Sequence, residues 1–99
     1  MGPKHYTKIV DERFIFPEEK GGGLIKFEVW EWEGKIVKYS MAYINRNLFT
    51  GDNGRVLGYD NTHAYHHRHY FGEIFPVDDF ESYEALVSRF EKEVKELLA

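Results

Sequence analysis

The sequence predicts an α+β fold in which a mostly antiparallel sheet of four to five strands packs against one C-terminal amphipathic helix. Apolar and polar residues alternate over residues 24–45, which is the period of a strand. Clusters of Gly, Asn, Asp and Pro interrupt this pattern at short intervals, as turns do in an antiparallel meander. After Pro76 the apolar spacing changes once, to the period of a helix. Residues 1–99 are therefore expected to form a single domain, with the sheet over residues 4–71 and the helix over residues 82–98.

Two strands are expected on either side of a glycine-rich turn. Residues 4–16 contain β-forming side chains such as Ile9 and Phe14, although three consecutive charged residues interrupt the alternation and indicate a bulge or bend. Residues 17–23 begin with proline and end with three glycines, a composition that favours a turn. Apolar and polar residues alternate over residues 24–33, but Trp30 and Trp32 fall on the face opposite the other apolar side chains. Either both faces are partly covered there, or a bulge changes the register.

Further strands follow two turn signals. The dipeptide Glu33-Gly34 supplies a tight hairpin turn and leads into residues 36–45, the strongest predicted strand. A Gly-Asp-Asn-Gly sequence at residues 51–54 predicts the next turn. Short strands are then expected at residues 55–59 and 65–71, which completes a meander of four or five strands.

The C-terminal segment has the signals of an amphipathic helix. Ser82 is a suitable N-cap, and Glu84 places a negative charge in the first turn. Apolar side chains recur at helical spacing and form one stripe, made of Leu86, Val87, Phe90, Val94, Leu97 and Leu98. Because a helix buries such a stripe against another element, one face of the sheet is its expected partner.

The composition excludes several classes of protein. The 99 residues are 42% hydrophobic and 17% aromatic, which suffices for a compact core and argues against intrinsic disorder. The absence of cysteine excludes a disulfide framework and cysteine-based metal sites. No apolar run reaches the roughly 18 residues of a membrane helix, and the N-terminus lacks a signal-peptide pattern, so a cytoplasmic protein without a membrane partner is expected. The absence of glutamine beside many Glu, Lys and Arg residues is typical of proteins from hot environments.

Charge is distributed unevenly along the chain. The net charge of −4 argues against a protein that binds nucleic acid over its whole surface. Residues 73–99 carry eight acidic and three basic side chains, whereas residues 1–72 are close to neutral before any histidine is protonated. The global charge therefore does not exclude an RNA contact on the part of the chain that bears the histidines.

Four of the five histidines lie within residues 63–69. If residues 65–71 are extended, His67 and His69 point to the same face at a spacing of about 6–7 Å, and His66 points to the other. Clustered titrating groups of this kind are more frequent at functional sites than elsewhere.

Two neighbouring imidazoles suit acid–base catalysis, because near neutral pH one can hold a proton while the other accepts one. In RNA cleavage without a metal, one histidine would take the proton of the 2′-hydroxyl and the other would donate a proton to the leaving oxygen. His67 and His69 are the candidate acid–base pair, and Asp60 and Asn61, which precede them in a loop-forming sequence, are further catalytic candidates. The candidates for binding the phosphate or base of the substrate are Tyr59, Arg68 and Tyr70.

Two other interpretations of the cluster remain open. His63, His67 and His69, with Asp60 as a carboxylate, have the ligand types that zinc or another divalent ion takes, although the chain has no standard helical metal signature. No other cofactor is expected. Alternatively, the rings pack over the core with their polar tips in water, and the histidine face docks a protein or nucleic acid without catalysis.

A family resemblance rests on the residues around this cluster. Residues 58–61 (Gly-Tyr-Asp-Asn) are followed by residues 67–70 (His-Arg-His-Tyr), by Phe80 and by the amphipathic helix. These residues, and the order of the predicted elements over most of the chain, resemble the TumE family, the toxin component of prokaryotic toxin–antitoxin pairs. The family pattern usually has a glycine-rich step where this chain has Ala64 and Tyr65.

The resemblance implies a toxin encoded beside a DNA-binding, helix-turn-helix antitoxin, and it is compatible with a homodimer. By position, the motif residues are Asp60, Asn61, His67 and His69. Together with the acid–base interpretation, it predicts a toxin-like ribonuclease that needs no metal. The alternatives are a non-catalytic binding module and a histidine-rich metal-binding protein.

Overall fold

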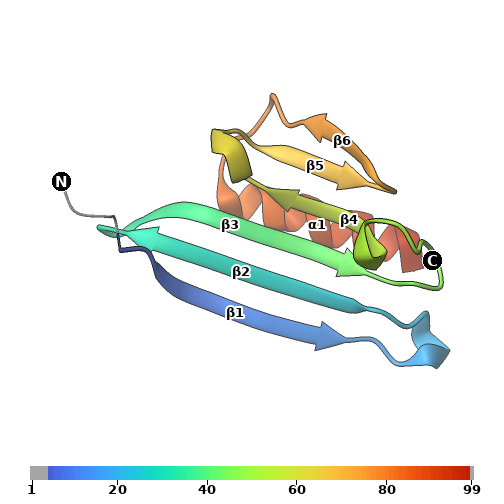
Figure 1. Ribbon diagram of the computed structural model, residues 1–99. Coiled ribbons are helices and arrows are strands. Elements are labelled where there is room, and N and C mark those ends of the chain that lie inside the picture. Colours follow the sequence, from blue (N-terminus) through green and yellow to red (C-terminus); the bar gives the residue numbers. More distant parts are fainter. Residues whose placement is uncertain (1–4, 99) are drawn as a thin grey trace.

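A six-stranded antiparallel sheet with one helix on one of its faces forms the protein (Figure 1). The computed structural model describes residues 5–98, so Lys4, where the first strand was expected to begin, lies outside the described residues. Each strand pairs with the next one along the chain. The elements are β1 (Thr7–Ile15), β2 (Leu24–Trp32), β3 (Lys35–Ile44), β4 (Arg55–Asp60), β5 (His67–Tyr70), β6 (Glu73–Pro76) and α1 (Tyr83–Leu98), with single 3-10 turns at Glu18–Lys20, Asp52–Gly54 and Thr62–Ala64. The predicted α+β class is confirmed.

The prediction of four to five strands is wrong, because it misses β6. The turn before β6 consists of Phe71 and Gly72, both at positive φ (47° and 84°), and Tyr70 pairs with Glu73 across it. Such a two-residue hairpin turn is usually signalled by Asn, Asp or Gly at its first position, and a phenylalanine gives no such signal. β6 is also a short, exposed edge strand that ends in a proline, so it has no alternating pattern to recognise.

Three local features of the strands test the expectations from the sequence. β5 begins at His67 and not at residue 65, because the preceding chain forms a turn in which His63 and Ala64 have positive φ. The register of β2 against β3 shifts after Trp30, so a bulge does occur beside the tryptophans. In β1 the irregularity lies between Lys8 and Val10, and not at the charged residues that follow.

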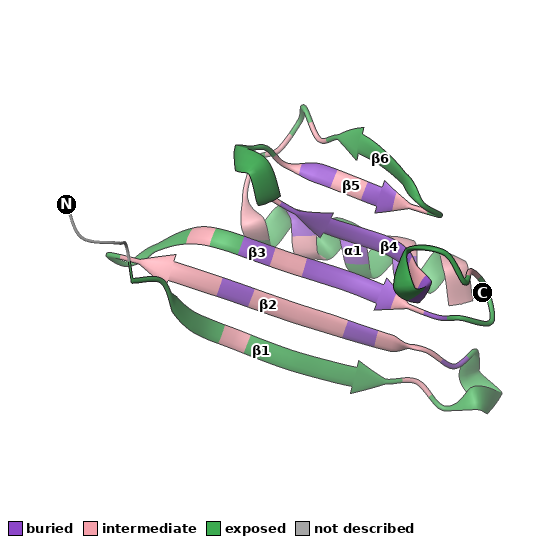
Figure 2. Ribbon diagram, viewed as in Figure 1, coloured by how far each residue is buried: buried purple, intermediate pink, exposed green. Residues whose placement is uncertain are grey.

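The helix α1 covers the centre of the sheet, over β3 and β4 (Figure 2). Its predicted N-cap is confirmed, since the backbone N–H of Ala85 donates to Ser82 Oγ at 3.1 Å. Phe90 belongs to the apolar stripe of α1 and is buried. Its ring packs edge to face on the rings of Phe27 and Tyr59, whose centroids lie 5.5 and 6.4 Å from its own.

Strand and helix residues share one core between the sheet and α1. Its buried apolar members are Ile25, Val29, Tyr39, Met41, Tyr43, Val56, Leu57, Tyr59, Leu86, Phe90 and Val94. Within residues 5–98, no helix combines the length and the apolar character that crossing a membrane requires.

Replacement of Phe90 by alanine should lower the free energy of unfolding by about 3–5 kcal/mol, because it leaves a cavity where sheet and helix meet. Urea denaturation followed by circular dichroism measures this. Ser88→Ala is the matched control on the exposed side of the same helix, with an expected change below about 0.5 kcal/mol. Equal effects of the two changes would contradict the packing described.

Candidate active site

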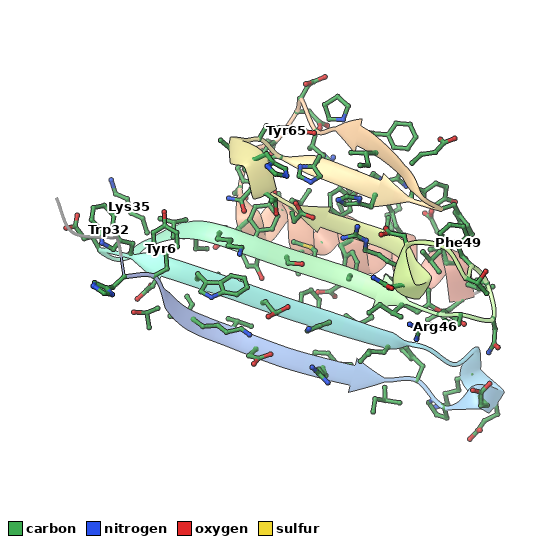
Figure 3. The ribbon with its side chains drawn as sticks, in the orientation of Figure 1. Tyr6, Trp32, Lys35, Arg46, Phe49 and Tyr65 are labelled. Carbon is green, nitrogen blue, oxygen red and sulfur yellow. The ribbon has the colours of Figure 1, made fainter. Side chains whose placement is uncertain are left out.

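His67 and His69 lie on the face of the sheet opposite α1, as the alternation predicts. His67 pairs with Asp60 and His69 with Gly58 in the β4–β5 ladder. The residue between them, Arg68, points to the helix face and contacts Glu93 of α1. Figure 3 views the sheet from the face opposite α1.

The carboxylate of Asp60 joins the two imidazoles. Its Oδ1 lies 2.7 Å from Nε2 of His67, and its Oδ2 lies 3.1 Å from Nε2 of His69. The backbone N–H of Thr62 donates to Oδ1 at 3.0 Å, which holds the carboxylate in place. The ring centroids of the histidines are 4.9 Å apart. The structure thus brings together three of the four predicted catalytic candidates.

Arg55 is a fourth member of this cluster, and the sequence analysis missed it. Its Nη2 lies 3.1 Å from Nδ1 of His69, its Nη1 lies 3.8 Å from Asp60 Oδ2, and its Nε donates to Asp52 at 2.8 Å. The side chain reaches His69 by crossing Gly58, where an added Cβ would lie 2.8 Å from Arg55 Cδ. The glycine in the motif was the available signal, because a glycine inside a strand often marks a close approach of another group.

Hydrogen-bond donors and acceptors assign different protonation states to the two histidines. Nδ1 of His67 lies 3.1 Å from the carbonyl oxygen of Tyr65, and its Nε2 faces Asp60. Both partners accept, so both nitrogens of His67 carry a proton. For His69 the guanidinium of Arg55 can only donate to Nδ1, so the single proton lies on Nε2. These contacts are those of an imidazolium at His67 and of a neutral ring at His69.

The local charges agree with this assignment. Burial and the guanidinium of Arg55 lower the pKa of His69 below its ordinary value of 6.5, although Asp60 acts in the opposite direction. The carboxylates of Asp52 and Asp60 balance the guanidinium and the imidazolium of His67. The cluster of Asp52, Arg55, Asp60, His67 and His69 therefore carries no net charge when His69 is neutral.

Access to the pair is narrow. His67 and His69 are 5% and 7% exposed, so a ligand can reach their ring nitrogens only after neighbouring groups move. The neighbours that cover them, Tyr65 and Arg55, are themselves partly exposed at the surface. The ring of Tyr65 lies 4.7 Å from the ring of His67 and is 48% exposed, and the side chain of Arg55 is 25% exposed.

The arrangement does not fit a divalent metal well. Ligand atoms of Asp60, His67 and His69 lie within 4.8 Å of one another, which is close enough for a shared ion. A metal at Nε2 of His69 would have to displace the proton that the contact of Nδ1 with Arg55 places there. A metal would also sit beside the guanidinium, which lies 3.8 Å from Asp60. His63, the third predicted ligand, is exposed in the preceding turn and outside this group.

Asn61 pairs with backbone groups and not with the histidines. Its Oδ1 accepts from the N–H of Tyr39 at 3.0 Å, and its Nδ2 donates to the carbonyl of Val37 at 3.0 Å. The side chain thereby extends the pairing of β4 with β3 by one residue. It fixes where the loop to β5 begins.

The three predicted substrate-binding residues lie on the helix face. The Tyr59 hydroxyl and the Arg68 guanidinium both donate to the carboxylate of Glu93. Burial and Glu93 raise the pKa of Tyr59 to about 12, so the hydroxyl remains protonated. Arg68 also lies over the ring of Tyr70, 4.4 Å from its centroid. The structure does not bring these side chains to the histidine pair.

His66 is part of the packing of the helix face, as the alternation predicts. Its ring stacks on Phe80 with centroids 3.6 Å apart, and its Nδ1 lies 2.7 Å from the Tyr39 hydroxyl. Burial and the charge of His67 lower the pKa of His66.

We expect Gly58→Ala to lower the free energy of unfolding by about 1–3 kcal/mol, because the new methyl group displaces Arg55 from His69. In an Arg55→Ala background, Gly58→Ala should lower the free energy of unfolding by clearly less. Urea denaturation of both single variants and the double variant gives the coupling energy. Equal costs in the two backgrounds would show that Gly58 does not serve to admit Arg55.

In an Arg55→Ala variant the pKa of His69 should rise, because the variant loses a nearby cation and exposes the imidazole to water. An NMR titration of the ring protons measures this. His66 is the internal control, since its lowered pKa has other causes. A midpoint for His69 that is unchanged or lower in the variant would contradict the electrostatic role of Arg55.

In the native chain, stability contributed by neutral His69 is present above about pH 6.5 and is lost as the pH falls below it.

Comparison with known proteins adds one finding. The model of the family described as Toxin TumE matches residues 8–98, which is nearly the whole chain. Neither a curated protein nor a solved structure matches it.

Proposed function

The chain belongs to the TumE family of toxins, and we propose that it acts as the toxin of a toxin–antitoxin pair by cleaving RNA without a metal. The observation that carries this proposal is the pair of imidazoles that contact the two oxygens of Asp60. Cleavage of RNA by its own 2′-hydroxyl needs one group that accepts a proton and one that donates a proton. His69, which is neutral, supplies the first, and His67, which is an imidazolium, supplies the second.

The role of Arg55 follows from its two contacts. A guanidinium binds phosphate strongly and in a fixed geometry, so an RNA phosphate competes with His69 for Arg55. When Arg55 turns to the phosphate, Nδ1 of His69 becomes free to take the 2′-hydroxyl proton. The 2′-oxygen then attacks phosphorus, the bond to the 5′-oxygen breaks, and His67 gives that oxygen a proton. The products are a 2′,3′-cyclic phosphate and a 5′-hydroxyl end.

A cavity on the far side of Tyr65, lined by His63 and His66 and not by His67, is suited to a nucleotide base. It has a volume of about 430 Å³, and Lys38, Asn61 and Tyr65 are among its lining residues. The ring of Tyr65, which covers His67, offers a stacking surface, and the ammonium of Lys38 offers a positive charge. The sequence predicted substrate binding by Tyr59 and Arg68. In this proposal they instead hold the sheet to α1 through Glu93.

The family implies an antitoxin as partner. That this antitoxin is a helix-turn-helix protein, and that the toxin forms a homodimer, remain predictions. The alternative function is a non-catalytic module that binds a protein or nucleic acid through the same face. The low exposure of both histidines favours this alternative, because a buried pair can also serve only to hold β4 to β5.

The test is cleavage of a mixed-sequence RNA by purified protein in excess EDTA. His67→Gln and His69→Gln should each lower the rate by about 10²-fold or more, because an amide keeps a donor near Asp60 but transfers no proton. The cleaved RNA should carry 2′,3′-cyclic phosphate ends, and RNA with 2′-O-methyl groups throughout should stay intact.

His5→Asn is the matched control, since His5 is exposed and lies outside both the cluster and the lining of the cavity. It should cleave like the wild type. Cleavage that continues unchanged in both glutamine variants, or a wild type that cleaves no RNA, would contradict the catalytic proposal and favour the binding module. Activity that EDTA abolishes would assign the chemistry to a metal.

A further inference from the structure

The single helix leaves β1 without a cover on its side of the sheet and covers β2 only in part. α1 lies over β3 and β4, while β1 and β2 extend beyond it (Figure 1). The side chains of β1 on this face include Phe14, which is 50% exposed although it is aromatic. Its ring contacts Phe27 of β2 edge to face, with centroids 6.2 Å apart. Apolar surface that would be core in a fully covered sheet is therefore open to solvent.

This surface and the near side of α1 form one groove of about 690 Å³. Most of its lining is apolar and comes from three elements. β1 and β2 supply Val10, Phe14, Ile25 and Phe27, and α1 supplies Val87 and Leu98.

The dimensions of the groove match one helix. Two strands are about 10 Å wide at a spacing of 4.7–4.9 Å, and a helix with its side chains is about 10–12 Å in diameter. Two packed helices lie about 8–10 Å apart, so a second helix beside α1 would rest on β1 and β2. The same arrangement would complete the cover of this half of the sheet.

The rim of the groove is acidic. Its charged lining residues are three carboxylates, Glu12, Glu84 and Glu91, and one ammonium, Lys95. Burial is the largest cause of the raised pKa of Tyr83, which also lines the groove, and the carboxylates of Glu12 and Glu84 raise it further. Basic residues on both sides of an apolar stripe would complement this rim.

We propose that this groove binds an amphipathic helix of a partner protein, with its apolar stripe on β1 and β2 and Lys or Arg residues against the acidic rim. The site is separate from the histidine pair, which lies on the other face of the sheet, so the proposal does not depend on the chemistry there. A second copy of the chain fits less well. The outward side of α1 carries exposed charged residues such as Arg89, Lys92 and Glu96, which a sheet stacked over the groove would have to bury.

The test uses two fluorescein-labelled helical peptides of about 18 residues, a length near that of the nine-residue strands. Both carry the same leucine stripe; one has lysines and the other glutamates beside it. By fluorescence anisotropy the lysine peptide should bind the full chain at micromolar concentration, and the glutamate peptide should bind at least tenfold more weakly. Glu84→Lys with Glu91→Lys, both exposed positions, should reverse this preference.

Phe14→Ser should lower the affinity for the lysine peptide at least tenfold. Ile74→Ser, at an exposed position on β6, should leave this affinity unchanged. Circular dichroism establishes that each variant is folded. Absence of binding, equal binding of the two peptides, or binding that is indifferent to Phe14→Ser and to the charge reversal would overturn the proposal. A dimer in analytical ultracentrifugation that Phe14→Ser dissociates would also overturn it, because a second copy would then be the occupant.

Discussion

The antiparallel pairing of β4 with β5 is the constraint on which the rest of the structure depends. Their register sets Asp60 opposite His67 and Gly58 opposite His69. Because side chains alternate between the faces of a strand, the same register sends Tyr59 and Arg68 to the other side, where both bond Glu93. A slip of β5 by one residue would turn His67 and His69 to the helix face and leave the buried carboxylate of Asp60 without these partners. One ladder therefore fixes both the candidate site and the attachment of α1.

The cluster around Asp60 combines stability with reactivity in a way that follows from its charges. A carboxylate is costly to bury unless donors surround it, and here two imidazoles and the Thr62 N–H donate to it. Meeting this need leaves one histidine charged and the other neutral, because Arg55 occupies the remaining nitrogen of His69. In the proposed mechanism, the same contacts that stabilise the fold place a proton donor next to a proton acceptor.

The coverage of the sheet gives its two faces different properties. Six strands are too wide for one helix, so α1 buries the centre, covers β2 only in part and leaves β1 open. The groove on that face is apolar with an acidic rim. The opposite face carries the histidine pair together with Trp30, whose ring lies 5.2 and 4.6 Å from the ammonium groups of Lys8 and Lys38. A partner helix on one face would leave the other face free.

Local sequence patterns determined the class of fold, the helix with its cap at Ser82, and the separation of His67 and His69 from His66. These features depend on the period of side chains along a single strand or helix, and the sequence contains that period directly. Only the tertiary structure decided the sixth strand, the contact of Arg55 with a histidine 14 residues away, and the burial of the pair. Such features depend on which strands lie side by side and what covers them. The side chain of Asn61 is an example of a contact that depends on strand pairing. Its type marks a loop, but its role as a backbone partner of Val37 and Tyr39 exists only once β3 and β4 are paired.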